Sequence, residues 1–175
     1  MDFKKIILAL GVIVPVLSSC DKDKGSDLTD KDVCEVITDK TFKAQVYSQF
    51  DSNNDGIITK TEAEAVTSIS VSDTKITSLS GIEVFTKLET LSINGVSIST
   101  LDLSKNTALV TVGIVACSYL ASVTFGSVAT IESLVITGTK ISSLDVTKMT
   151  ALKSLDCSKN SLTALDVTKN TALQT

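Results

Sequence analysis

A phrase of about 21 residues recurs along most of this chain, and its clearest copy is Thr150–Asn170, TALKSLDCSKNSLTALDVTKN. Aliphatic side chains return with this period at equivalent positions: Val66, Ile69 and Val71; Leu88, Leu91 and Ile93; Leu109, Val112 and Ile114; Ile131, Leu134 and Ile136; and Leu152 and Leu155, followed by Cys157. A fixed period of this length indicates a protein built of stacked repeats, because one unit alone cannot bury its apolar side chains. A further copy begins at Thr171, so the sequence ends inside a sixth repeat.

A further aliphatic follows each triplet, and the full spacing becomes L-x-x-L-x-L-x-x-N-x-L. This pattern resembles the leucine-rich repeat, and the resemblance covers roughly residues 64–175. It implies a solenoid with one short parallel β-strand per repeat of 21 or 22 residues and irregular or short β segments on the convex side. We therefore assign residues 66–175 to five repeats and a truncated sixth.

Three cysteines follow Cys20, and all three are predicted to be packing residues. Cys117 falls on the Asn position of the repeat motif, where Cys is a known alternative, and Cys157 replaces a core aliphatic. These two lie two repeats apart, roughly 10 Å along the stack, which is too far for a disulfide. Cys34, flanked by aliphatic residues, is interpreted as a small apolar filler at the domain edge.

A helix–loop–helix segment precedes the repeats. Phe42, Val46, Tyr47 and Phe50 fall at helical spacing, and either Thr38 or Asp39 can cap this helix, which runs into Asp51. The twelve residues Asp51–Glu62 match the EF-hand calcium loop, whose ligands here would be Asp51, Asn53, Asp55, Ile57 through its carbonyl, Thr59 and Glu62. A second short helix is expected from about Lys60 to Val66.

Calcium is the predicted cofactor, because three carboxylates and neutral oxygens in one short loop repel each other unless a hard cation lies among them. The alternative is a solvated cluster of Asx turns, since Asn, Asp and Gly form turns without a metal. The loop has no second copy, whereas calcium sensors usually pair such loops. We therefore predict a structural calcium, and we assign residues 38–65 to an N-terminal cap on the repeats.

The N-terminus has the pattern of a secretion signal, with Lys4 and Lys5 before the apolar run Ile6–Leu17. The run is too short to span a bilayer. Leu17-Ser-Ser-Cys20 resembles the bacterial lipobox, which implies a signal peptide over residues 1–19, a lipid on Cys20 and a flexible tether over residues 20–37. The alternative is a buried Cys20 in an N-terminal helix. Lipidation implies a membrane partner and the bacterial cell envelope, with the outer membrane or cell surface favoured over the inner membrane.

The strand positions between the core residues should face the concave side of the solenoid and form its binding surface. We select there Ser92, Asn94, Val115, Val135, Thr137, Asp156 and Ser158. These side chains are small and mostly neutral, and Tyr119 is a further candidate for surface contact. The recurrent Asp and Lys of the second half-repeats, such as Asp102 with Lys105, are interpreted as solvated turn residues rather than an acid–base site.

Composition excludes several classes of function. The chain contains no His, which removes the commonest general base, and no nucleophile–base pair can be assembled, so we predict no enzyme within these residues. A net charge of −4 argues against nucleic-acid binding. The expected partner is a protein or a glycan on the concave face.

Together the repeats, the calcium loop and the lipobox resemble internalin-like leucine-rich-repeat lipoproteins of Gram-negative envelopes. That resemblance implies an adhesion or protein-interaction module. The alternative is a tether and spacer of a longer surface protein, whose hydrolase or glycan-binding domain would lie beyond Thr175.

Overall fold

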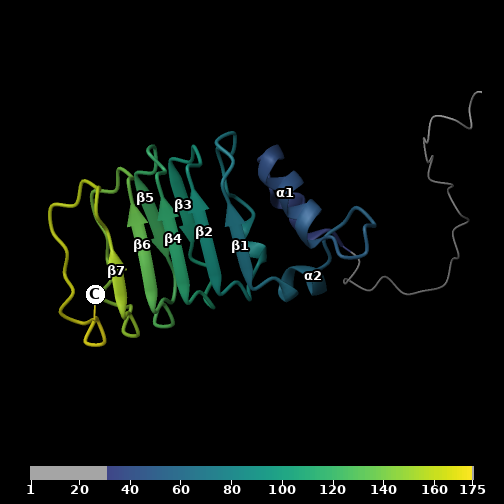
Figure 1. Ribbon diagram of the computed structural model, residues 1–175. Helices are drawn as coiled ribbons and strands as arrows, with labels where there is room; N and C mark the ends of the chain where they lie inside the picture. The colour runs from purple at the N-terminus through teal and green to yellow at the C-terminus, as the bar shows by residue number, and fades with distance from the viewer. Residues whose placement is uncertain (1–30, 175) are drawn as a thin grey trace, which may run out of the picture.

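The computed structural model describes residues 31–174 and shows a row of strands with a helical cap at one end (Figure 1). The elements are η4 (Val33–Val36), α1 (Lys40–Phe50), α2 (Lys60–Ala65), β1 (Ser68–Val71), η5 (Ile82–Val84), β2 (Thr90–Asn94), β3 (Thr100–Leu103), β4 (Thr111–Val115), β5 (Ser122–Phe125), β6 (Ser133–Thr137) and β7 (Ser154–Asp156). The predicted signal peptide and Cys20 lie outside the described residues. Within residues 31–174, no helix combines the length and the hydrophobicity that crossing a membrane requires.

The repeats form two parallel sheets. The larger has the order β1-β2-β4-β6-β7, and the smaller pairs β3 with β5. The register joins equivalent positions of successive repeats, as in the row Ile69, Leu91, Val112, Leu134 and Leu155. The predicted solenoid with one parallel strand per repeat is therefore confirmed, and β3 and β5 are its short second-side strands.

Alternation of side chains along each strand explains why these segments form a sheet with one buried face. In β2 the side chains of Leu91 and Ile93 are fully buried, whereas those of Ser92 and Asn94 are exposed. Successive strand residues point to opposite faces, so this pattern directs every aliphatic triplet inward. The buried side chains form one continuous hydrophobic cluster from Cys34 to Leu152.

The helical cap closes the β1 end of this cluster. Asp39 caps α1 by accepting from the N–H groups of Thr41 and Phe42, and Phe42 and Val46 are buried. The same carboxylate accepts from the Thr77 N–H and hydroxyl through its other oxygen, at 2.9 and 3.1 Å. The Asp39 side chain therefore both caps α1 and attaches it to the first repeat.

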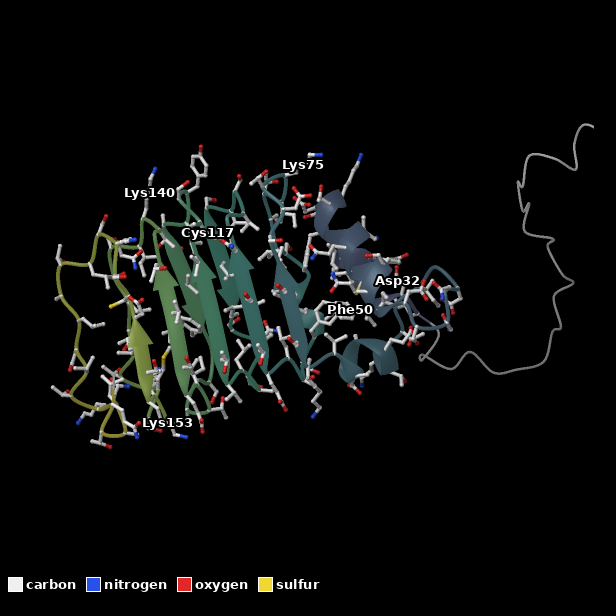
Figure 2. The ribbon with its side chains drawn as sticks, in the orientation of Figure 1. Asp32, Phe50, Lys75, Cys117, Lys140 and Lys153 are labelled. Carbon is white, nitrogen blue, oxygen red and sulfur yellow. The ribbon has the colours of Figure 1, made fainter. Side chains whose placement is uncertain are left out.

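Two further contacts join the cap to the repeats. The Gln45 side-chain amide donates to the Ser70 carbonyl at 2.8 Å and so occupies part of the free edge of β1. The rings of Phe50 and Phe85 lie 5.8 Å apart between their centroids. Figure 2 shows Phe50 between the helices and the sheet.

The packed cap begins earlier than the predicted tether boundary at residue 37. Cys34 and Ile37 are buried at 0% and 3% exposure. Gly81, which has a φ of +98°, lies against Ile37, and a Cβ at this glycine would come within 2.4 Å of the Ile37 side chain. We name residues 32–37 the strap, because this segment crosses the cap and packs on the turn of the first repeat.

Candidate functional site

The first half of the predicted calcium loop is held by its own backbone. Asp51 accepts from the N–H groups of Asp55 and Gly56 at 3.2 and 3.0 Å, one on each carboxylate oxygen. The Asn53 Oδ1 accepts from the same Asp55 N–H, and the Asp55 Oδ1 accepts from the Ile57 N–H. These bonds bring Asp51, Asn53 and Asp55 together around one turn, in which Gly56 has a φ of +85°.

Glu62 is turned toward loop positions 2 and 9. Its Oε1 accepts from the N–H and hydroxyl of Ser52 at 3.0 and 2.7 Å, and its Oε2 accepts from the N–H and hydroxyl of Thr59 at 3.0 and 2.9 Å. Thr59 in turn caps α2, so the two residues form a capping box. The hydrogen bonds from Ser52 and Thr59 lower the pKa of Glu62 to about 2. The structure thus places Glu62 and Thr59 beside each other.

The oxygen chemistry of this loop fits calcium. All six predicted ligands offer oxygen: two Asp, one Glu, one Asn, one hydroxyl and the Ile57 carbonyl. A carboxylate oxygen has lone pairs beyond the one that accepts an N–H, so these bonds orient Asp51 and Asp55 without exhausting them. Within residues 31–174, no three His, Cys, Asp or Glu side chains lie together as a ready ligand group, which is consistent with Glu62 being bonded to Ser52 and Thr59.

The open face of the five-stranded sheet is the second candidate site. Its central positions are in register from strand to strand, as Ser70, Ser92, Gly113, Val135 and Asp156. Of the predicted surface residues, Ser92, Asn94, Val115, Asp156 and Ser158 are exposed, and Val135 and Thr137 are half-buried. Short side chains on paired strands make this face regular and rigid.

Exposed apolar and aromatic groups lie at the C-terminal end of β4, the central strand of this sheet. Val115 ends β4 and is 40% exposed, and Tyr119, in the loop that follows, is 60% exposed. The Lys140 ammonium lies 5.5 Å from the centre of the Tyr119 ring, a cation–π contact. Lys140 projects from the edge where the strands end (Figure 2). Phe125, by contrast, packs against the core.

The recurrent Asp residues of the half-repeats form turns. The carboxylates of Asp102, Asp145 and Asp166 each accept from the N–H group two residues later, at 2.8 to 2.9 Å. Hydrogen bonds from Thr147 lower the pKa of Asp145, and those from Thr168 do the same for Asp166. The turn interpretation of these carboxylates is confirmed.

The described cysteines are free thiols. Burial raises the pKa of Cys34 to about 12, which suppresses the thiolate form that reacts. Cys117 is fully buried at the Asn position of its repeat, and its thiol lies 3.5 Å from the Val115 carbonyl. In the last complete repeat Asn160 fills that position and accepts from the Thr139 hydroxyl and N–H. The predicted packing roles of Cys34 and Cys117 agree with this burial.

Two sets of buried contacts were not predicted from the sequence. Asn106 and Asn170 are 2% and 4% exposed, and each side-chain amide donates to two carbonyls of the preceding repeat. Their recurrence in the phrase Lys-Asn-Thr-Ala-Leu was the available signal. The second set centres on Asp32, which caps η4 and contacts the calcium loop. The available signal for this second set was an Asp directly before the short apolar run Val33–Ile37, because Asp is a common N-cap residue.

Comparison with known protein families identifies the repeats. A family model described as the endo-beta-N-acetylglucosaminidase EndoS LRR domain matches residues 37–160. The chain belongs to this leucine-rich-repeat family. The match begins within the strap and includes the cap, so the EndoS-type LRR unit extends beyond the repeats themselves.

One solved structure places this EndoS-type LRR protein among internalin-like proteins. It is similar to the functional domain of InlJ from Listeria monocytogenes, a domain described as including a cysteine ladder, with 29% identity and a TM-score of 0.66 over 82% of this chain. The match covers 32% of the InlJ chain, so the protein spans about a third of its length. An internalin, InlF, from L. monocytogenes 4b F2365 matches 81% of this chain and 69% of its own at 15% identity and a TM-score of 0.35. No curated relative matches the chain.

Proposed function

We propose that this internalin-like protein is a non-catalytic binding module of the bacterial cell envelope that recognises a protein ligand on its open sheet face. The observation that carries the proposal is the exposure of Val115 and Tyr119 at the C-terminal end of β4, the central strand of that face. Tyr is enriched among the residues that anchor protein interfaces, and Val115 adds exposed apolar area beside it. The small side chains of the rest of the face allow a partner to approach the sheet closely.

Capture of envelope and extracellular proteins from the source bacterium by the full chain in detergent tests this function. We expect Val115→Asp to reduce capture of the specific partner at least about tenfold, because burial of an unpaired carboxylate is strongly unfavourable. Ser122→Asp places the same charge on the exposed side of β5, on the smaller sheet, and should leave capture unchanged. Equal capture by both variants and the parent would count against the proposed face.

We further propose that the chain is held at the outer membrane or cell surface by a lipid on Cys20. The support is the pattern Leu17-Ser-Ser-Cys20 after a charged and then apolar N-terminus. Cys20→Ser should move the protein from the membrane fraction to the soluble fraction. Retention of this variant in the membrane fraction would contradict lipid anchoring.

The calcium loop is proposed to hold one structural calcium through Asp51, Asn53, Asp55, Thr59, Glu62 and the Ile57 carbonyl. Its support is the complete set of oxygen donors and the convergence of the first three side chains. The cation would neutralise the mutual repulsion of the carboxylates. On binding, Glu62 would give up its hydrogen bonds from the Ser52 and Thr59 hydroxyls and bind the cation instead. The bound cation would then join the start of α2 to the end of α1.

Thermal melting with and without a calcium chelator tests this site. At free calcium 100-fold above the dissociation constant, binding adds about 2.7 kcal/mol to the free energy of unfolding, or roughly 5 to 10 °C in the melting midpoint. Asp51→Ala and Glu62→Ala should lose this calcium response. Glu64→Ala removes an acidic side chain from α2 outside the loop motif and should retain it. A parent midpoint that does not respond to chelator would contradict the calcium role.

A second candidate function follows from the family. The matched model is named for the LRR domain of an endo-beta-N-acetylglucosaminidase, so LRR units of this family occur in a glycan-acting enzyme. The described residues would then be the accessory part of a longer protein. Sequencing the gene beyond Thr175 distinguishes the two: an open reading frame that continues into a hydrolase or glycan-binding domain favours this alternative.

A further inference from the structure

Asp32 joins the strap to the calcium loop. Its Oδ1 accepts from the N–H groups of Cys34 and Ile58, at 3.0 and 3.2 Å, and its Oδ2 accepts from the Tyr47 hydroxyl. The N–H of Val33 donates to the Ile58 carbonyl at 2.9 Å. Both backbone groups of Ile58 are therefore bonded to the strap. Figure 2 shows Asp32 at the end of the molecule that carries α1, α2 and the loop.

Ile58 is a fixed point of the loop for a second reason. Its side chain is fully buried in the core cluster, whereas Asn53, Asp55 and Gly56 are exposed. Loop positions 3 to 6 thus lie in solvent, and position 8 is held by the strap on its backbone and by the core on its side chain. The orientation of the intervening residue, Ile57, depends on this anchor.

The planarity of the peptide bond links Asp32 to the predicted Ile57 ligand. The Ile57 carbonyl and the Ile58 N–H belong to one peptide group, and in a trans peptide these two bonds point in opposite directions. Since the Ile58 N–H points at Asp32, the Ile57 carbonyl points away from the strap. The Asp32 carboxylate consequently sets the direction of the one backbone ligand in the loop.

The negative charge of Asp32 should also strengthen the Ile57 carbonyl as a calcium ligand. A carboxylate at the N–H end of a peptide polarises the group and increases the electron density on its carbonyl oxygen. A cation at the carbonyl end favours the same polarisation. Groups that orient and polarise a metal ligand in this way typically change metal affinity 10- to 100-fold when they are removed.

We propose that Asp32 is a positioning residue of the calcium site, and that calcium binding and strap docking stabilise each other. The proposal rests on the proposed calcium function of the loop. Because binding free energies are reciprocal, calcium in the loop must hold the strap more tightly by the same factor by which the strap tightens calcium binding. The loop would then secure the segment that leads from the predicted lipid to the folded domain.

Calcium titration calorimetry on the full chain in detergent tests the proposal, with calcium alone as the probe. Asp32→Ala should weaken calcium binding about 10-fold, and Asp32→Asn, which keeps an Oδ1 acceptor but loses the charge, should weaken it less. Glu35→Ala removes an equal charge from the exposed part of the same strap and should bind as the parent does. Melting midpoints in chelator show whether each variant is folded.

Tyrosine emission supplies a separate readout of strap docking. The chain has no Trp and two Tyr, so Tyr119→Phe leaves Tyr47 as the one emitter, and its hydroxyl is bonded to Asp32. Calcium should change Tyr47 emission in this background, and Asp32→Asn should remove most of that change.

The outcomes distinguish failure of the proposed role of Asp32 from failure of the proposed calcium site. If the parent and Asp32→Ala bind calcium equally, or if Glu35→Ala weakens binding as much as Asp32→Ala, the positioning role is overturned and the calcium site stands. Where Asp32→Ala does not fold, parental affinity in Asp32→Asn overturns the role of the charge. A parent that binds no calcium overturns both proposals.

Discussion

Glu62 is held ionised by hydrogen bonds from Ser52 and Thr59, and its pKa of about 2 lies below its ordinary value of 4.5. A carboxyl group whose pKa is lower in the folded state stabilises the fold above its unfolded pKa, and this stabilisation is lost as the pH falls through the folded pKa. We therefore predict that Glu62 stabilises the protein above about pH 4.5 and that this contribution disappears between about pH 4.5 and pH 2.

Melting midpoints of the parent and Glu62→Gln in chelator, measured from pH 6 to pH 2, check this prediction. The parent should melt higher at pH 6, and the two curves should converge toward pH 2. Parallel curves over this range would show that the hydrogen bonds of Glu62 do not favour its charged form. Because calcium is absent, this result is independent of the metal site.

The sequence predicts candidate calcium ligands around Glu62, but it does not reveal how these side chains are arranged. The spacing from Asp51 to Glu62 predicts a set of oxygen donors from sequence alone, because the motif is local. It could not show that Glu62 accepts from Ser52 and Thr59, since both the capping box and the calcium loop use the same Thr and Glu. Nor could it show the contact of Asp32 with Ile58, which joins residues 26 positions apart.

Among the elements, two turns on the second side of the repeats are joined to the preceding repeat by asparagine. The Asn106 side-chain amide donates to the carbonyls of Ile82 and Phe85 at 2.9 and 3.1 Å. Asn170 does the same with Val146 and Met149 at 2.8 Å. These bonds tie each of the two turns to the turn 21 to 24 residues before it. At the equivalent position of the other repeats, Val128 and Met149 are buried apolar side chains that contribute packing instead of hydrogen bonds.

We predict that Asn106→Ala lowers the free energy of unfolding by about 1 to 3 kcal/mol, because buried hydrogen bonds are lost and a small void remains. Urea unfolding followed by circular dichroism measures the change. Asn94→Ala, on the exposed face of β2, is the matched control and should change stability by no more than about 0.5 kcal/mol. Equal effects of the two substitutions would contradict the role of the buried asparagine.

The strands and helices were largely predictable, and the strap was not. The period of the aliphatic residues determined the strands, since a repeat one residue out of phase would turn its core to solvent. Phe42 and Val46 determined the buried side of α1. The strap is a short apolar run that follows a polar stretch and has no helical or strand period, and its burial depends on the docking of Ile37 against Gly81, a contact that only the folded first repeat provides.

At the scale of the whole molecule, one core cluster runs from the strap to the fifth repeat, and its two sides differ. The larger sheet offers a regular face of short side chains, with Val115 and Tyr119 at the C-terminal end of its central strand. The opposite side of the repeats carries the Asx-turn carboxylates Asp102, Asp145 and Asp166, each followed three residues later by Lys, whereas the larger sheet has this kind of turn at the end of its edge strand β7, at Asp156. This asymmetry is the basis for assigning ligand binding to the larger sheet.

Site-specific photo-crosslinking tests that assignment most directly. A photoreactive amino acid placed at Val115 on the larger sheet and, separately, at Ser122 on the smaller sheet would be activated in intact cells that express the full chain. We predict a discrete crosslinked protein band from position 115 and none from position 122. Crosslinking from position 122 alone, or equally from both positions, would contradict a binding face on the larger sheet.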